Sequence, residues 1–94
     1  MARTGEWGVR LYLFEEAGTT KARMVLDTGT TSLTGHGKAQ CKPEDVDVPE
    51  IGDELAASRA MSDLAAQLQQ TAYDDLEGVR AHSQATRTQP TEPA

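Results

Sequence analysis

The spacing of apolar residues changes partway along the chain, and this change most constrains the fold. Over residues 7–39 apolar and polar side chains alternate, which is the period of a half-buried β-strand. Over residues 55–79 apolar side chains recur every three or four positions, which is the period of a helix. The pattern therefore predicts an α+β fold in which strands precede one long helix. A length of 94 residues fits a single domain.

Three alternating runs separated by two short turns predict a three-stranded antiparallel meander packed on the helix. The face expected toward the helix carries Trp7, Val9, Leu11 and Leu13, then Ala22, Met24 and Leu26, then Leu33, Gly35, Gly37 and Ala39. Two-residue turns at Ala17-Gly18 and Gly29-Thr30 would pair residue 11 with residue 24, and residue 24 with residue 35. Both registers bring the apolar sets onto one face, and a one-residue slip in either would break this agreement. Gly35 and Gly37 would let the helix approach the sheet closely.

The helix has two candidate starting points. Asp47, Pro49 and Glu50 resemble a capping box with proline in the first turn, whereas Gly52 favours a start at Asp53. Its apolar positions are Leu55, Met61, Leu64, Ala65, Leu68, Ala72, Leu76 and Val79. A helix of about 28 residues is roughly 40 Å long, whereas strands of about eight residues span only ~27 Å. Either the helix breaks, or Leu76 and Val79 contact another chain, which dimerisation would provide.

The ends of the chain are predicted as tails. We expect an N-terminal tail over residues 1–5, one β-β-β-α domain over 6–79, and a disordered tail over 80–94, which lacks large apolar side chains beyond Val79. No apolar run reaches the ~18–20 residues that cross a bilayer, and no secretory signal opens the chain. The single cysteine, Cys41, excludes an intramolecular disulfide. These features predict a cytoplasmic protein with no membrane partner.

The formal charge of −6 is unevenly distributed. Residues 1–40 carry five basic and four acidic side chains, whereas residues 41–80 carry three basic and ten acidic ones. An acidic chain is a poor general binder of nucleic acids, because neutralising phosphates supplies most of their nonspecific affinity. A local basic face remains available in the first half.

The predicted register collects cations and aromatic rings on the face of the sheet away from the helix. These residues are Arg10, Tyr12, Phe14, Lys21, Arg23, His36 and Lys38. Rings between cations resemble the platforms on which unpaired bases stack beside phosphates. The same pattern fits a solvated face with cross-strand cation–π pairs, or an interface for an acidic protein surface. All three interpretations remain open.

Motifs for catalysis and metal binding are weak. Asp27-Thr28-Gly29 matches the signature of aspartic proteases, but these residues also favour a turn, and such proteases are nearly all β. His36 and Cys41 lie five residues apart on a predicted strand and would point to opposite faces, so they do not form a zinc site. An acidic run comprises Glu44, Asp45, Asp47, Glu50, Asp53 and Glu54. We interpret it as a solvated helix start, and the alternative is a site for a divalent ion or a basic partner. We therefore expect no enzymatic activity, no metal and no cofactor.

The segment from Pro49 to Leu68, PEIGDELAASRAMSDLAAQL, resembles the signature helix of a small actinobacterial family of unknown function. The likeness extends back through LTGHGKA at residues 33–39 and the first two strands, and covers roughly residues 6–78. It implies three antiparallel strands and one long helix, grouped with folds like the double-stranded-RNA-binding domain. True members of that class add an N-terminal helix and place lysines where this chain has Glu50, Asp53 and Glu54. The resemblance therefore does not imply duplex RNA binding, and it supplies no catalytic residues.

Together these patterns predict a non-enzymatic interaction module. The first hypothesis is a homodimer, or a complex with a protein partner, formed through the outer face of the sheet and the helix end at Leu76 and Val79. The alternative is single-stranded nucleic-acid binding by the basic and aromatic face. An aspartic protease based on Asp27 is a remote third hypothesis.

Overall fold

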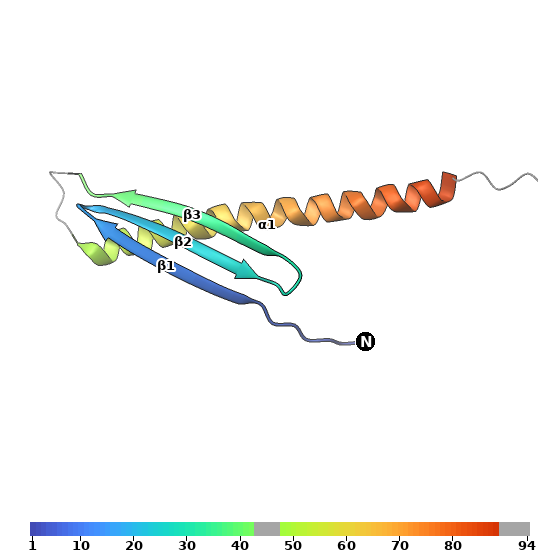
Figure 1. Ribbon diagram of the computed structural model, residues 1–94, viewed down its shortest axis with the longest axis horizontal. Coiled ribbons are helices and arrows are strands. Elements are labelled where there is room, and N and C mark those ends of the chain that lie inside the picture. Colours follow the sequence, from blue (N-terminus) through green and yellow to red (C-terminus); the bar gives the residue numbers. More distant parts are fainter. Residues whose placement is uncertain (43–47, 89–94) are drawn as a thin grey trace, which may run out of the picture.

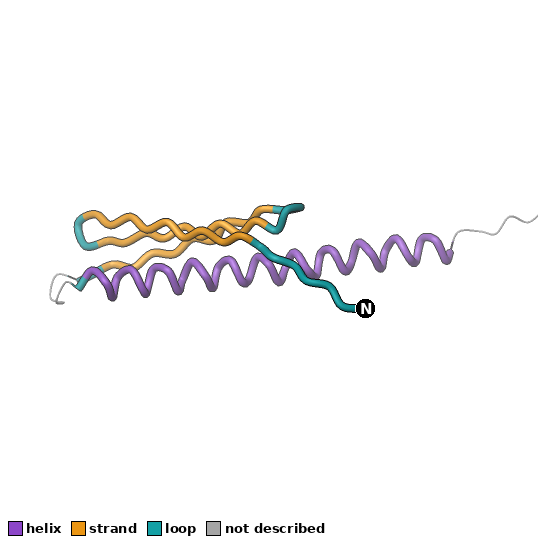
Figure 2. The backbone as a smooth tube through the Cα atoms, turned by 90° about the horizontal axis from the view of Figure 1, so that it is seen from below, coloured by secondary structure: helices purple, strands orange, loops and turns teal. Residues whose placement is uncertain are grey.

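The computed structural model describes residues 1–42 and 48–88. It contains β1 (Gly8–Glu16), β2 (Thr19–Asp27), β3 (Ser32–Gln40) and α1 (Pro49–Thr88). The strands form one antiparallel sheet in the order β1-β2-β3, and α1 lies along one face of it (Figure 1). A turned view shows the sheet and the helix as two layers (Figure 2). The predicted α+β fold is confirmed.

Both predicted strand registers are confirmed. Leu11 lies opposite Met24, and Met24 lies opposite Gly35. The first turn has φ angles of 52° at Ala17 and 78° at Gly18, as the tight hairpin turn with two left-handed residues requires. Gly29 has a φ of 93° in the second turn, so glycine is needed there as well. Since directly opposed residues share a face, the three apolar sets lie on the same side of the sheet.

The core is small and forms between α1 and the last two strands. Its buried apolar residues are Ala22, Met24, Leu26 and Ala39 from the sheet and Ala56, Ala60 and Leu64 from the helix. A Cβ atom on Gly37 would overlap the carbonyl oxygen of Ala56 and the backbone nitrogen of Ala60. A Cβ atom on Gly35 would lie 2.7 Å from the backbone nitrogen of Leu64. The predicted role of these two glycines, close approach of helix and sheet, is confirmed.

The apolar face of β1 points to the correct side of the sheet, but α1 does not cover it. Trp7, Val9, Leu11 and Leu13 keep between 38% and 55% of their surface exposed. Figure 1 shows α1 beginning beside the end of β1 and then crossing obliquely behind β2 and β3, so that most of β1 lies to one side. A helix about 10 Å across covers about two strands spaced ~4.8 Å apart, and the glycines draw it toward β3. The expectation that these four residues pack beneath the helix is therefore wrong.

The helix begins at Pro49 rather than Asp53. The N–H groups of Ile51 and Gly52 donate to the Val48 carbonyl at 3.0 and 3.4 Å, so the helix is already formed at Gly52. The proposed capping residue Asp47 lies outside the described residues, as do Glu44 and Asp45.

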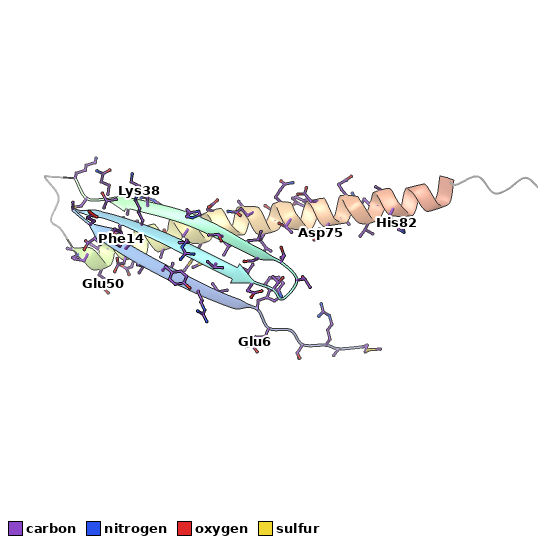
Figure 3. The ribbon with its side chains drawn as sticks, in the orientation of Figure 1. Glu6, Phe14, Lys38, Glu50, Asp75 and His82 are labelled. Atoms are coloured by element: carbon purple, nitrogen blue, oxygen red, sulfur yellow. The ribbon has the colours of Figure 1, made fainter. Side chains whose placement is uncertain are left out.

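The helix is also longer than predicted. It has 40 residues and continues to Thr88. The prediction of a disordered tail from residue 80 is therefore wrong for residues 80–88. Neither proline nor glycine follows Gly78 until Pro90, and alanine and arginine favour helix there. A helix of this length is about 60 Å long and extends well past the sheet, where Figure 3 shows Asp75 and His82. Within the described ranges, no helix is long and apolar enough to cross a membrane.

Candidate interaction surfaces

The outer face of the sheet brings together all seven residues predicted for it. Tyr12, Arg23 and His36 form one row across the three strands, and Phe14, Lys21 and Lys38 form the next. All of these side chains are exposed, as is that of Arg10. Figure 3 shows Phe14 on β1 and Lys38 on β3, at the end of the sheet near the start of the helix. The middle of this face is therefore basic and aromatic in a chain of net charge −6.

One of the two rings on the outer face is already engaged. The guanidinium carbon of Arg23 lies 4.3 Å from the centre of the Tyr12 ring. Such cation–π pairs contribute about 0.5–1 kcal/mol at exposed sites, so this pair stiffens the centre of the hairpin. Phe14, which is 62% exposed, keeps its ring available to a partner.

Three side chains of α1 form hydrogen bonds with the free edge of β3. Arg59, Asp63 and Gln67 follow one another at four-residue spacing and so lie on one flank of the helix. The three bonds are Arg59 Nη1–H to Lys38 O at 2.6 Å, His36 N–H to Asp63 Oδ2 at 2.8 Å, and Gln67 Nε2–H to Thr34 O at 2.7 Å. They satisfy backbone groups on alternate residues of β3 and hold the helix over that strand.

The contacts of Arg59, Asp63 and Gln67 with β3 were not predicted from the sequence. The regular spacing of three polar residues on the flank of an otherwise alanine-rich helix was the signal available.

Asp63 links the folded state to pH. The hydrogen bond from the His36 backbone N–H, helped by one from the Gln67 side chain, lowers the pKa of Asp63 below its ordinary value. A carboxylate with a lowered pKa stabilises the fold above its unfolded pKa, and this contribution is lost as the pH falls through the folded pKa. We expect Asp63→Ala to lower the melting temperature at neutral pH and to differ little from wild type in strong acid. Thermal unfolding measured across the acid range tests this. Glu54→Ala is the control, and its difference in melting temperature from wild type should not become smaller in acid.

The opposite edge of the sheet, on β1, is open. The Thr28 N–H donates to the Thr31 carbonyl at 3.0 Å, which sets the alternation of hydrogen-bonded pairs between β2 and β3. Even-numbered residues of β2 therefore bond to β3, and odd-numbered ones bond to the even-numbered residues of β1. The backbone groups left pointing outward belong to Val9, Leu11, Leu13 and Glu15. No described side chain forms a hydrogen bond with these groups, in contrast to β3.

Apolar side chains are exposed both on the inner face of β1 and on α1. Successive helix residues are 100° apart, so the flank opposite Asp63 carries Met61, Ala65 and Leu68. Met61 and Ala65 are exposed, and Leu68 packs only partly against the core. Trp7 and the inner side chains of β1 are exposed as well.

The motifs considered for catalysis do not assemble a reactive centre in the described part of the chain. The Gly29 N–H donates to Asp27 Oδ1 at 2.8 Å, and the Thr31 N–H donates to Thr28 Oγ1 at 3.1 Å, so Asp27-Thr28-Gly29 forms the favoured turn. The helix α1 takes the place of the further strands that a protease subunit needs. Among the residues described, no three histidine, cysteine or acidic side chains are grouped to hold a metal ion.

A cavity of about 330 Å³ lies where the start of α1 meets the turn between β1 and β2 and the end of β3. Its lining is mostly apolar or backbone, and includes Thr20, Cys41, Ile51 and Leu55. Glu15 is the one charged side chain among the described residues that line it. The thiol of Cys41 donates a hydrogen bond to the Lys42 carbonyl at 3.5 Å.

The fold defines a small α+β protein of three antiparallel strands and one long helix. The chain belongs to the Rv2632c-like family, whose family model matches residues 5–86. It is 40% identical over 73 residues to the uncharacterized protein Mb1767 of Mycobacterium bovis, covering 78% of each chain. It is 43% identical over 58 residues to the uncharacterized protein Rv2632c of Mycobacterium tuberculosis, covering 62% of each.

The crystal structure of Rv2632c superposes on this chain with a TM-score of 0.74 at 32% sequence identity, covering 95% of this chain and 98% of that one. These relatives confirm the small actinobacterial family of unknown function to which the helix segment pointed. Kinship to the double-stranded-RNA-binding fold stays a prediction.

Proposed function

We propose that the protein is a non-enzymatic interaction module that works as a homodimer with β1 at its interface. The observation that supports this is the inner face of β1, where Val9, Leu11 and Leu13 are exposed beside the core. Contiguous exposed apolar surface beside a core is typical of protein interfaces. The proposed contact therefore differs from the outer face of the sheet, although Leu76 and Val79 also remain exposed on the helix beyond it.

The small size of the core favours a second copy. Four of the seven buried apolar residues are alanines, so the monomer removes few large side chains from water. A second copy that covers the exposed inner side chains of β1 would bury further apolar surface without any change of fold.

The test is the mass of the protein in solution. We expect sedimentation equilibrium at micromolar concentration to give twice the chain mass of 10.1 kDa. Leu11→Asp buries a charge at the proposed interface and should weaken association by about 100-fold or more. The control is Lys38→Asp, which introduces the same side chain on the outer face of β3 and should leave the mass in solution unchanged. A wild-type protein that stays monomeric at high micromolar concentration contradicts the proposed function.

A second candidate function is single-stranded nucleic-acid binding by the outer face. The open ring of Phe14 beside Lys21 and Lys38 favours it, because bases stack on exposed rings next to cations that bind phosphates. We expect a labelled oligothymidylate to bind at low salt and to dissociate steeply as salt rises.

Fluorescence anisotropy measures this binding. Arg23→Glu should abolish it and Phe14→Ala should weaken it about tenfold or more, since stacking contributes roughly 1–3 kcal/mol per base. Arg80→Glu, which makes the same charge change on the helix beyond the sheet, is the control. Absence of binding at low salt would remove this function and leave two interpretations of the face, a solvated surface or an interface for an acidic protein.

A further inference from the structure

We propose that two copies join edge to edge through antiparallel pairing of their β1 strands, which forms one continuous six-stranded sheet. This inference rests on the proposed homodimer and specifies how its interface is built. In this arrangement the contact is made by the outward backbone groups of β1, in addition to its exposed apolar side chains. The partner it fits is the identical strand of a second copy.

The contrast between the two edges of the sheet is the first support. On β3, side chains of α1 bond to three backbone groups that point away from the sheet. On β1, the N–H and C=O groups of Val9, Leu11, Leu13 and Glu15 point outward with no such partner among the described residues. A long regular edge strand is a template for pairing, and proteins normally protect it with charged side chains, proline or a bulge. β1 has nine residues in unbroken register without proline or a bulge, and its charged residues Arg10, Glu15 and Glu16 leave the central segment from Leu11 to Phe14 uncharged.

The alternation of inward and outward backbone groups along β1 restricts the register of the dimer. Only odd-numbered residues of β1 have outward backbone groups, so odd-numbered residues must bond to odd-numbered residues of the partner. The pairing that overlaps all nine residues obeys this rule, and it places the two-fold axis at Tyr12, the central residue of the strand. Residue 11 then bonds to residue 13 of the second copy, and residue 9 bonds to residue 15.

The side chains are compatible with this register on both faces. On the inner face Leu11 lies opposite the partner's Leu13. The apolar faces of the two β1 strands then form one continuous surface, and each strand covers the edge of the other. On the outer face Arg10 meets the partner's Phe14, an arrangement suited to a cation–π contact. A slip of two residues in one direction places Glu6 opposite the partner's Glu16, and a slip in the other direction leaves strand residues unpaired.

Cysteine cross-linking in a Cys41→Ser background tests the register directly. At the axis, Tyr12 lies opposite the partner's Tyr12 in a pair that is not hydrogen-bonded, where Cα atoms are about 4.5 Å apart and a disulfide fits. We expect Tyr12→Cys to form a covalent dimer under mild oxidation at least about tenfold faster than Lys38→Cys on the far strand. Arg10→Cys and Phe14→Cys should cross-link when mixed, and each should do so slowly alone.

Amide hydrogen exchange of the unaltered protein gives a second measurement that does not depend on folding of a variant. The amides of Leu11 and Leu13 should be protected at concentrations where the protein is dimeric and should exchange rapidly on dilution. Association through the inner face alone would leave these amides unprotected.

The outcomes separate the inference from the proposed function. A dimeric mass with unprotected Leu11 and Leu13 amides, or equal cross-linking rates for Tyr12→Cys and Lys38→Cys, overturns the edge pairing and leaves the homodimer standing. A monomeric mass overturns both. Faster cross-linking at Tyr12 together with concentration-dependent protection supports both.

Discussion

Gly37→Ala should destabilise the protein by about 3 kcal/mol or more, which is the upper end of the cost of overpacking a core. The new Cβ atom would overlap the Ala56 carbonyl oxygen and the Ala60 backbone nitrogen. Both are helix backbone atoms and cannot rotate away as a side chain could, so the whole helix has to lift from β3. That displacement also strains the bond from Arg59 to the Lys38 carbonyl. Urea-induced unfolding followed by circular dichroism measures the loss.

Gly78→Ala is the matched control for this prediction. A Cβ atom on Gly78 meets nothing within 4 Å, and the residue lies inside α1. Alanine is favoured over glycine in a helix by about 1 kcal/mol, so this variant should be as stable as wild type or slightly more stable. If Gly37→Ala behaves like Gly78→Ala, the helix does not approach β3 as closely as described.

Leu26→Ala should cost about 2–5 kcal/mol, the range for deleting a large buried side chain. Leu26 is only 4% exposed and is one of the few large residues in a core dominated by alanine. Its removal leaves a cavity that Met24 and Leu64 are unable to fill without moving the helix. The loss should appear in chemical unfolding as a lower midpoint with an unchanged slope.

Val9→Ala tests which strand the helix covers. Val9 lies directly opposite Leu26 and on the same face, but it is 54% exposed. Measured at concentrations where the protein is monomeric, its truncation should cost less than about 1 kcal/mol. An equal loss from the two variants would show that α1 covers β1 as well as β2.

The strands, their register and the role of the glycines could be predicted because each depends on local rules. The alternation of residues 7–39 and the two short turns leave one register that keeps the apolar sets together, as pairs such as Leu11 and Met24 show. The outer face follows from the same register, which predicts that Tyr12 and Arg23 lie side by side, as they do.

The lateral position of the helix could not be predicted from periodicity. Alternation identifies the apolar face of each strand but does not show how many strands one helix covers. Here Gly35 and Gly37 let the helix settle on β3, and the bond between Asp63 and the His36 backbone holds it there. Leu11 and Leu13 were consequently assigned to the core, although they belong to the proposed interface.

The end of the helix was misplaced for a different reason. Predicting a tail from residue 80 assumed that a helix ends where its large apolar residues end. A helix can continue without them, because each added residue forms a further backbone hydrogen bond and alanine and arginine cost little.

The three bonds from α1 to β3 have a consequence for how large an assembly can grow. A sheet with two unprotected edge strands can add further strands at both edges without limit, as amyloid does. Here one margin is occupied by Arg59, Asp63 and Gln67, so addition is restricted to the other. In the proposed dimer, pairing through strands would therefore stop at two copies, and weakening these three contacts should allow polymers to form.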